Sequence, residues 1–185
     1  TVRCMAASAF FTVKIPGASR ATDYEVDLAA VIGKTAATVG EADSLNYVAG
    51  YTVANGLSAH DFFLRPPLPS TSPFFVDWLG HKSFDGSCPL GPWIVPTRDV
   101  GNPQELGIRL WVNGELKQDS NTKEMIFTLA EQIAHLSTRI TLAPGDVILT
   151  GTPAGVGSAR GVFLKPGDAV ELWCEKVGTL KHTMA

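Results

Sequence analysis

The sequence lacks long hydrophobic runs, paired cysteines and clusters of basic residues. No apolar segment reaches the roughly 20 residues of a membrane-spanning helix, so we expect no membrane contact. Three cysteines without Cys-x-x-Cys spacing indicate a reduced intracellular protein, cytoplasmic or mitochondrial. A net charge of −3 without a basic stripe argues against nucleic-acid binding. These absences leave a protein that acts on small molecules or other proteins.

The composition indicates one turn-rich domain. With 185 residues, 45% of them hydrophobic, residues 1–185 can bury one core but hardly two. Gly 18 and Pro 12 favour turns over long helices. We predict an α+β fold that is mostly β, with a strand near the N-terminus within residues 1–11 rather than a signal peptide. Further strands are expected at 24–32, 47–54, 107–112, 146–150 and 168–174.

Local patterns predict the connections between these strands. Asn113-Gly114 favours a tight hairpin turn, and the Pro-Gly-Asp motifs at 143–146 and 165–168 favour type II turns. Asn121 and Glu124 resemble the start of a helix whose apolar face repeats at helical spacing through Ile126, Leu129, Ile133 and Leu136. The segment 62–80 has four prolines and four phenylalanines and is expected to be a long shaped loop, either beside a site or simply on the surface.

Two acidic residues interrupt an otherwise apolar strand at 24–32. Glu25 and Asp27 are two residues apart, so their side chains point to the same face of a strand. Adjacent carboxylates repel each other unless a cation or solvent separates them. Mg²⁺ and Mn²⁺ prefer such oxygen ligands. The pair therefore indicates either a divalent-cation site or a strand with one solvated face.

A glycine-rich turn follows the expected strand 146–150. The segment 148–157 lacks the Gly-Lys-Ser/Thr of a phosphate-binding loop, and no helical pattern follows it, which argues against a dinucleotide site. Exposed backbone N–H groups in such a turn can hold a substrate oxygen.

Several segments together resemble the fumarylacetoacetate hydrolase family, in the same order along roughly residues 20 to 180. They include Asp-Tyr-Glu-Val-Asp-Leu at 23–28, Tyr-Val-Ala-Gly-Tyr-Thr at 47–52, Lys-Ser-Phe-Asp at 82–85, Cys-Pro-Leu-Gly-Pro at 88–92 and Gly-Asp-Val-Ile-Leu-Thr-Gly-Thr-Pro at 145–153. The resemblance implies a mixed β-sandwich roll with one long helix packed on it, assembled as a homodimer.

The resemblance also implies a set of site residues. In the family, a Glu-x-Glu pair and a later Asp bind Mg²⁺ or Mn²⁺, which suggests Glu25, Asp27 and Asp61 as metal ligands. Lys82 falls on the family's pocket lysine, expected to bind substrate and take part in catalysis. The same expectation applies to Thr152, with Gly151 and His60 as further substrate contacts. Two positions depart from the family: His60 stands where Arg is common, and Gly56 where Asp is frequent.

One family feature is missing from the residues before the acidic pair. Active relatives carry a His and a Glu on an N-terminal lid, whereas residues 1–23 contain neither. Two hypotheses remain open: the protein lacks the lid, or a mobile lid near Met5–Ala9 is omitted from the sequence. We favour the second, with residues 1–23 as an incomplete lid region, because lids are often disordered without ligand.

The sequence therefore predicts a metal-dependent hydrolase or lyase. Its substrate would be a small 2-oxo acid or 1,3-dicarbonyl compound, cleaved at a carbon–carbon bond by acylpyruvate hydrolysis or by decarboxylation of the oxaloacetate type. The alternative is a non-catalytic family member that keeps the fold and cation as a dimerisation or binding module.

Overall fold

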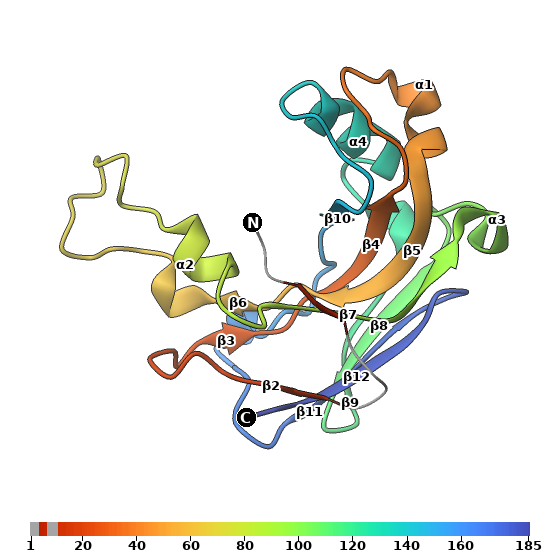
Figure 1. The fold of residues 1–185 in the computed structure, drawn as a ribbon. Helices are drawn as coiled ribbons and strands as arrows, with labels where there is room; N and C mark the ends of the chain where they lie inside the picture. The colour runs from red at the N-terminus through yellow and green to blue at the C-terminus, as the bar shows by residue number, and fades with distance from the viewer. Residues whose placement is uncertain (1–3, 7–10) are drawn as a thin grey trace.

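Two five-stranded sheets make up most of the fold (Figure 1). The computed structural model describes residues 4–6 and 11–185. The first sheet, in spatial order, consists of β1 (Cys4–Ala6), β7 (Cys88–Pro96), β5 (Val48–Asn55), β4 (Val26–Ile32) and β10 (Val147–Leu149). The second consists of β2 (Phe11–Val13), β12 (Gly178–Met184), β11 (Ala169–Cys174), β8 (Gly107–Val112) and β9 (Glu115–Asn121). Because β1 and β2 pair parallel to their neighbours and the other strands pair antiparallel, both sheets are mixed.

The core lies where the two sheets pack face to face. Strands β4 and β5 of the first sheet contact β8, β11 and β12 of the second. All seven residues of β4 are buried, including Asp27 at 2% exposure. The solvated-face alternative for this strand is therefore wrong, and Asp27 is held inside the protein. The expected α+β fold, mostly β, is confirmed.

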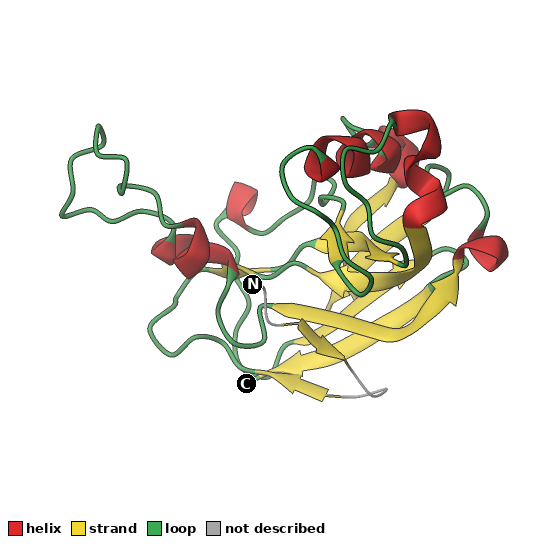
Figure 2. Cartoon of the chain, turned by 45° about the horizontal axis from the view of Figure 1, so that its top comes forward, coloured by secondary structure: helices red, strands yellow, loops and turns green. Residues whose placement is uncertain are grey.

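The main helix begins later in the chain than the sequence predicted. Helix α4 spans Leu129–Ser137, and Thr128 caps it in a reciprocal capping box with Glu131. Asn121 instead caps a short 3-10 turn, Thr122–Glu124, and Ile126 is 91% exposed. The helix begins after Thr128 rather than after Asn121 because the capping box satisfies two backbone N–H donors at once. Helix α1 (Glu41–Ser44) packs against α4 (Figures 1 and 2).

The predicted turns are confirmed. Val112 pairs with Glu115 across the Asn-Gly turn. In both Pro-Gly-Asp turns the glycine has a positive φ, +94° at Gly145 and +92° at Gly167, as a type II turn requires. In each, the Asp carboxylate accepts a hydrogen bond from the first residue's N–H at 2.7 Å. The aspartates thereby fix the turns that lead into β10 and β11.

An extended arm, residues 62–79, projects from the sheets (Figure 1). Its two sides meet at a bridge between Leu64 and Val76, and helix α2 (Trp78–Lys82) returns the chain to the body. The start of the chain contributes β1, β2 and β3 (Thr22–Asp23), and β3 pairs with β6 (Ser58–Ala59). The lid hypothesised near Met5–Ala9 lies partly outside the described residues, because residues 7–9 are not among them. Helix α3 (Thr97–Val100) is short, and within the described chain no helix has the length and apolarity to cross a membrane.

Candidate functional site

The two acidic residues of the first sheet face one pocket. Glu25 immediately precedes β4, and Asp27 is its second residue. Both line a pocket of about 250 Å³ together with Lys82, Gly56 and Gly151. The predicted pairing of the two carboxylates with the lysine is thus present in the structure.

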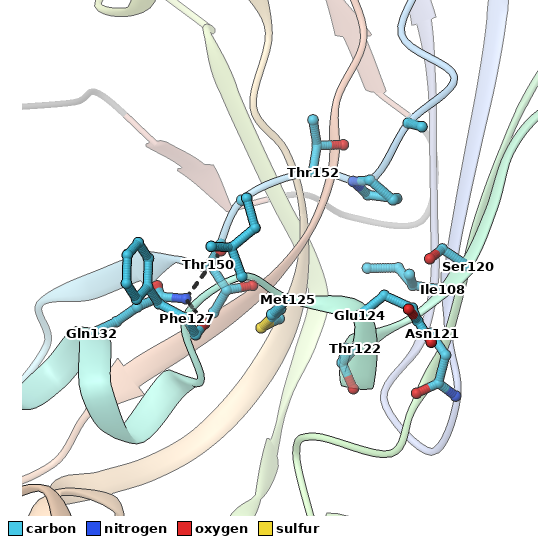
Figure 3. A pocket seen from close by; sticks show the side chains of 14 residues that line it. Ile108, Ser120, Asn121, Thr122, Glu124, Met125, Phe127, Gln132, Thr150 and Thr152 are labelled. Carbon is cyan, nitrogen blue, oxygen red and sulfur yellow. Dashed lines mark hydrogen bonds between the residues drawn. The ribbon is translucent and has the colours of Figure 1, made fainter.

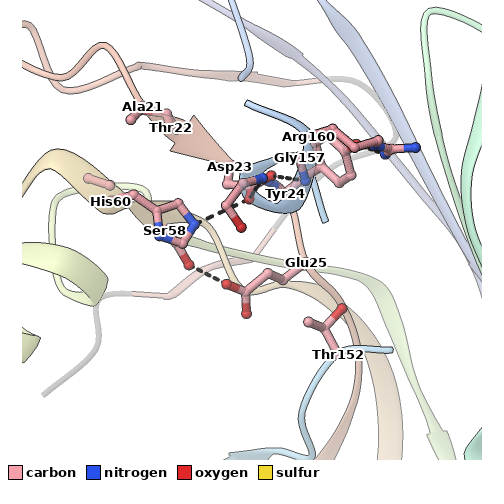
Figure 4. Close-up of polar contacts among 12 residues, drawn as sticks. Ala21, Thr22, Asp23, Tyr24, Glu25, Ser58, His60, Thr152, Gly157 and Arg160 are labelled. Atoms are coloured by element: carbon pink, nitrogen blue, oxygen red, sulfur yellow. Dashed lines mark hydrogen bonds and ion pairs between the residues drawn. The ribbon is translucent and has the colours of Figure 1, made fainter. Parts of the chain in front are cut away.

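Three groups hold Glu25 in place. Lys82 Nζ, at the end of α2, donates to Glu25 Oε1 at 2.7 Å and to the Gly56 carbonyl at 3.1 Å. Ser58 Oγ donates to the same Oε1 (Figure 4). The backbone N–H of Glu25 donates to Asn55 Oδ1 at 2.9 Å. One carboxylate oxygen is therefore fully engaged, and Oε2 remains toward the pocket.

Asp27 is held by the glycine-rich turn. The Gly151 N–H donates to Asp27 Oδ1 at 2.7 Å, and Gly151 has a φ of +99°, a conformation that favours glycine. Burial, together with the nearby Glu25 carboxylate, raises the pKa of Asp27 to about 7. A buried acid beside a second acid is the electrostatic setting that a bound cation relieves.

Gly56 forms the floor between the two carboxylates. A Cβ built on Gly56 would lie 2.7 Å from Asp27 Oδ2 and 3.7 Å from Glu25 Oε2. Within the described chain, no hydrogen bond engages either of these two oxygens. They therefore face a common space that a side chain at position 56 would fill.

This arrangement fits a hard divalent cation. Mg²⁺ commonly takes one or two protein carboxylates and completes its shell with water and substrate oxygens. Glu25 and Asp27 supply two such carboxylates, each with one oxygen directed to the space above Gly56. The residues present are consistent with Mg²⁺ or Mn²⁺ held by two protein ligands.

Asp61, predicted as a third ligand, is not among the residues that line the pocket of this pair. Its carboxylate accepts hydrogen bonds from Ser19 Oγ at 2.7 Å and from the Arg20 N–H at 2.6 Å. No group of three His, Cys, Asp or Glu side chains among residues 4–6 and 11–185 is placed to hold a metal ion. Asp61 follows Glu25 and Asp27 in sequence, but it lies in the short turn His60–Phe62 and anchors the 19–20 loop.

His60 contacts Asp23, whereas the sequence predicted a contact with the substrate. Its Nε2 lies 3.2 Å from Asp23 Oδ2 (Figure 4), and its ring packs against that of His81 at a tilted angle of 58°. Asp23 is fully buried and accepts hydrogen bonds from the backbone N–H groups of Gly157 and Ser158. His60 thus helps fix the 157–158 turn, and it is not among the residues that line the carboxylate pocket.

Thr152 lines a second, larger hollow of about 460 Å³ (Figure 3). Its hydroxyl accepts a hydrogen bond from Gln118 Nε2 at 2.8 Å, and Gln118 Oε1 accepts from the Val26 N–H. Gly151 lines both pockets, so the two adjoin at this residue. Thr152 therefore faces the neighbouring hollow, and Gln118 ties its turn to the strand that carries the acids.

Sequence reasoning assigned no role to Asp23 or Gln118. The signal for Asp23 was present, because acids at 23, 25 and 27 alternate with the period of a strand. Gln118 gave no comparable signal. Its partners lie 34 and 92 residues away in the chain, so only the fold brings them together.

A family model and several curated proteins are similar to this chain in sequence. Residues 5–185 match the family model described as fumarylacetoacetate (FAA) hydrolase C-terminal. A mitochondrial oxaloacetate tautomerase of Xenopus laevis is 43% identical over 172 residues, which cover 92% of this chain and 52% of the relative. A 2,4-didehydro-3-deoxy-L-rhamnonate hydrolase from Sphingomonas is 40% identical, covering 94% of this chain and 59% of the relative. The chain thus spans little more than half the length of these curated relatives.

Solved structures share the fold closely. Fumarylpyruvate hydrolase from Pseudomonas aeruginosa, crystallised with Mn²⁺ and pyruvate, superposes with a TM-score of 0.87 at 30% identity. The match covers all of this chain and 74% of that one. A 2-hydroxyhepta-2,4-diene-1,7-dioate isomerase from Mycobacterium marinum gives a TM-score of 0.82 at 33% identity, covering 96% of this chain and 65% of that one.

Proposed function

The chain belongs to the fumarylacetoacetate hydrolase family, and from this premise we propose that it is a divalent-cation-dependent enzyme acting on a small 2-oxo acid or 1,3-dicarbonyl compound. The observation that carries the proposal is the pocket in which Glu25 and Asp27 converge beside Lys82. Names of the relatives support the substrate class, since oxaloacetate, fumarylpyruvate and a didehydro sugar acid all contain a 2-oxo acid or related group.

Each residue of the pocket has a distinct part in this proposal. Glu25 and Asp27 would hold the cation through the two oxygens that face Gly56. When bound, the cation supplies Lewis-acid polarisation of the substrate's oxo group. Lys82 brings a fixed positive charge to the pocket wall, where it stabilises negative charge that develops on a substrate oxygen. Ser58 and Gly151 keep the two carboxylates oriented, so little reorganisation is needed during the reaction.

The second hollow would accept the remainder of the substrate. It adjoins the carboxylate pocket at Gly151, and its lining includes the apolar side chains of Ile108, Met125 and Phe127. Glu124 is the charged member of this lining among the described residues. We therefore propose that a substrate group that enters this hollow is uncharged, because none of the described lining residues is basic, and that a short acid such as oxaloacetate stays within the carboxylate pocket beside Lys82.

The reaction is carbon–carbon cleavage or tautomerisation through an enolate-like state. Hydrolysis of an acylpyruvate, decarboxylation of an oxaloacetate-like acid and enol–keto tautomerisation of such an acid all build negative charge on the same oxygen. Hydrolysis needs in addition a base that activates water. All three reactions therefore share the need for Lys82 and the acidic pair.

Three assays on one preparation test this proposal. With Mg²⁺ or Mn²⁺ present, acylpyruvate hydrolysis, oxaloacetate decarboxylation and oxaloacetate tautomerisation are followed for the wild type, Lys82→Met and Lys34→Met. Lys82→Met should lower kcat/KM by roughly a hundredfold or more, the typical cost of removing one oxyanion-stabilising group. Lys34 is exposed and should be neutral when replaced. If the wild type shows no cation-dependent activity in any assay, the catalytic proposal fails and the binding-module alternative gains support.

A further inference from the structure

Ser87 is a buried residue beside the carboxylate pair, and no role described so far uses its hydroxyl. It is 1% exposed and lines the same pocket as Glu25, Asp27 and Lys82. Within the described part of the chain, its Oγ has no hydrogen-bond partner. Buried hydroxyls in folded proteins are nearly always hydrogen-bonded, so this exception calls for a physical reason.

The backbone around Ser87 is fixed. Its N–H donates to the Phe84 carbonyl at 3.0 Å, and Gly86 before it has a φ of +81°. Strand β7 begins at the next residue, Cys88. The hydroxyl is therefore presented to the pocket by a turn and a strand of the first sheet, and a local shift of the chain would not easily supply it with a partner.

The charges of the pocket favour an anionic ligand near this hydroxyl. The lining contains two acids, Glu25 and Asp27, and one basic residue, Lys82. A divalent cation on the two acids would leave the pocket with net positive charge. A hydroxyl can donate a hydrogen bond to an anionic oxygen without adding charge of its own.

We propose that Ser87 is a substrate-contacting residue whose hydroxyl donates a hydrogen bond to an oxygen of the acid bound in this pocket. The inference rests on the proposed function, because it assumes that the acid binds beside Glu25, Asp27 and Lys82. The bound acid would then meet two hydrogen-bond donors, the Ser87 hydroxyl and the Lys82 ammonium. The two donors come from different elements of the fold. A site built around such a donor discriminates against analogues that lack the matching oxygen.

Binding measurements with oxalate test the inference. Oxalate does not react, and its oxygens imitate those of a 2-oxo acid and its enolate. Titration calorimetry at saturating Mg²⁺ gives its affinity for the wild type, Ser87→Ala, Ser87→Cys and the control Ser83→Ala. Loss of a hydrogen bond to a charged group should weaken oxalate binding by roughly tenfold to a hundredfold in Ser87→Ala. Ser87→Cys, a weaker donor of similar size, should give an intermediate loss and serves if the alanine variant does not fold.

Two further readings separate a substrate contact from a structural role. Mg²⁺ affinity without oxalate and the melting temperature without ligand should be unchanged in Ser87→Ala, because the hydroxyl has no internal bond to lose. Ser83→Ala should bind oxalate like the wild type, since Ser83 does not line the pocket. Equal oxalate affinity in Ser87→Ala and the wild type overturns the inference and leaves the proposed function standing. A wild type that binds Mg²⁺ but not oxalate overturns the inference, and one that binds neither overturns both.

Discussion

At the scale of single residues, a glycine shapes the carboxylate pocket as strongly as the acids do. A Cβ at Gly56 would lie 2.7 Å from Asp27 Oδ2 and 3.7 Å from Glu25 Oε2, so a side chain there would enter the space beside both oxygens. Because position 56 is a glycine, it adds no third carboxylate to the two that Glu25 and Asp27 offer to a cation. The remaining positions of the cation are then open to water and substrate oxygens.

Replacing Gly56 tests this description. Gly56→Asp adds a third carboxylate to the pair, which should lower the melting temperature in EDTA because like charges repel. It should also enlarge the rise in melting temperature that Mn²⁺ causes, because a better-liganded cation stabilises the native state more. Thermal unfolding with and without Mn²⁺ measures both effects. Gly56→Asn is the matched control of equal size without charge, and a Mn²⁺-dependent rise no larger in Gly56→Asp than in Gly56→Asn would contradict the description.

Residue patterns in the sequence located part of this site. Glu25 and Asp27 were found because strand periodicity fixes which way neighbouring side chains point. The family resemblance identified Lys82. The resemblance also suggested Asp61 as a third ligand, but the direction of a side chain in a short turn cannot be read from the sequence, and the structure places this carboxylate on other partners. Its partners, Ser19 and Arg20, are about 40 residues earlier and meet it only in the folded protein.

At the scale of elements, the strand that carries the acids is tied to both sheets. Asn55 ends β5 and accepts a hydrogen bond from the Glu25 N–H. Its side-chain amide also lies 3.0 Å from Nε2 of His182, on β12 of the second sheet. Burial lowers the pKa of His182 to about 4. The contact between the sheets therefore depends on a neutral histidine.

This contact predicts a pH-dependent stability. In the unfolded chain His182 titrates near its ordinary pKa of 6.5, so between pH 6.5 and 4 the unfolded state takes up a proton that the native state excludes. The contribution of His182 to the free energy of unfolding should therefore fall as the pH drops through this window, by up to about 3 kcal/mol, whereas the raised pKa of Asp27 acts in the opposite direction. Urea unfolding in EDTA at pH 7, 6 and 5 measures the change.

Two variants isolate the contribution of His182. His182→Gln keeps an acceptor for the Asn55 amide and does not titrate, so it should lose less stability than the wild type as the pH falls from 7 to 5. His135→Gln, at an exposed position of α4, should follow the wild type. An unchanged pH dependence in His182→Gln would show that other groups cause the loss of stability.

Elements differ in how well the sequence predicted them. The five expected strands were right because each is an apolar run, and two of them, at 146–150 and 168–174, also follow a Pro-Gly-Asp turn. Strand β7 was not predicted, because its Pro-Leu-Gly-Pro start resembles a loop and its pairing partner β5 lies far back in the chain. The helix start was placed too early because apolar spacing from Ile126 looked helical, whereas the Thr128–Glu131 capping box sets the true boundary.

At the scale of the whole molecule, the arm 62–79 leaves apolar side chains in solvent. Phe74, Trp78 and Leu79 are 67, 64 and 70% exposed, and they lie close together in the chain. Large exposed apolar patches are uncommon on monomers. We propose that a second copy of the chain covers this arm in a homodimer.

Mass measurement by light scattering tests the dimer. The wild type should have twice the monomer mass, and the double variant Phe74→Asp/Leu79→Asp should shift toward the monomer because charge opposes apolar burial. Ile140→Asp changes an exposed apolar residue outside the arm and should leave the mass unchanged. A monomer mass for the wild type over a wide concentration range would refute the proposal.

The central claim is that Glu25 and Asp27, without Asp61, hold the divalent cation, and direct Mn²⁺ binding tests it best. Electron paramagnetic resonance counts free Mn²⁺ in titrations of the wild type, Glu25→Gln and Asp61→Asn, each checked for folding by circular dichroism. We expect one Mn²⁺ per chain, an affinity lowered at least about tenfold in Glu25→Gln because ligand charge tunes affinity, and wild-type binding in Asp61→Asn. Loss of Mn²⁺ binding in folded Asp61→Asn, with binding retained in Glu25→Gln, would contradict the claim.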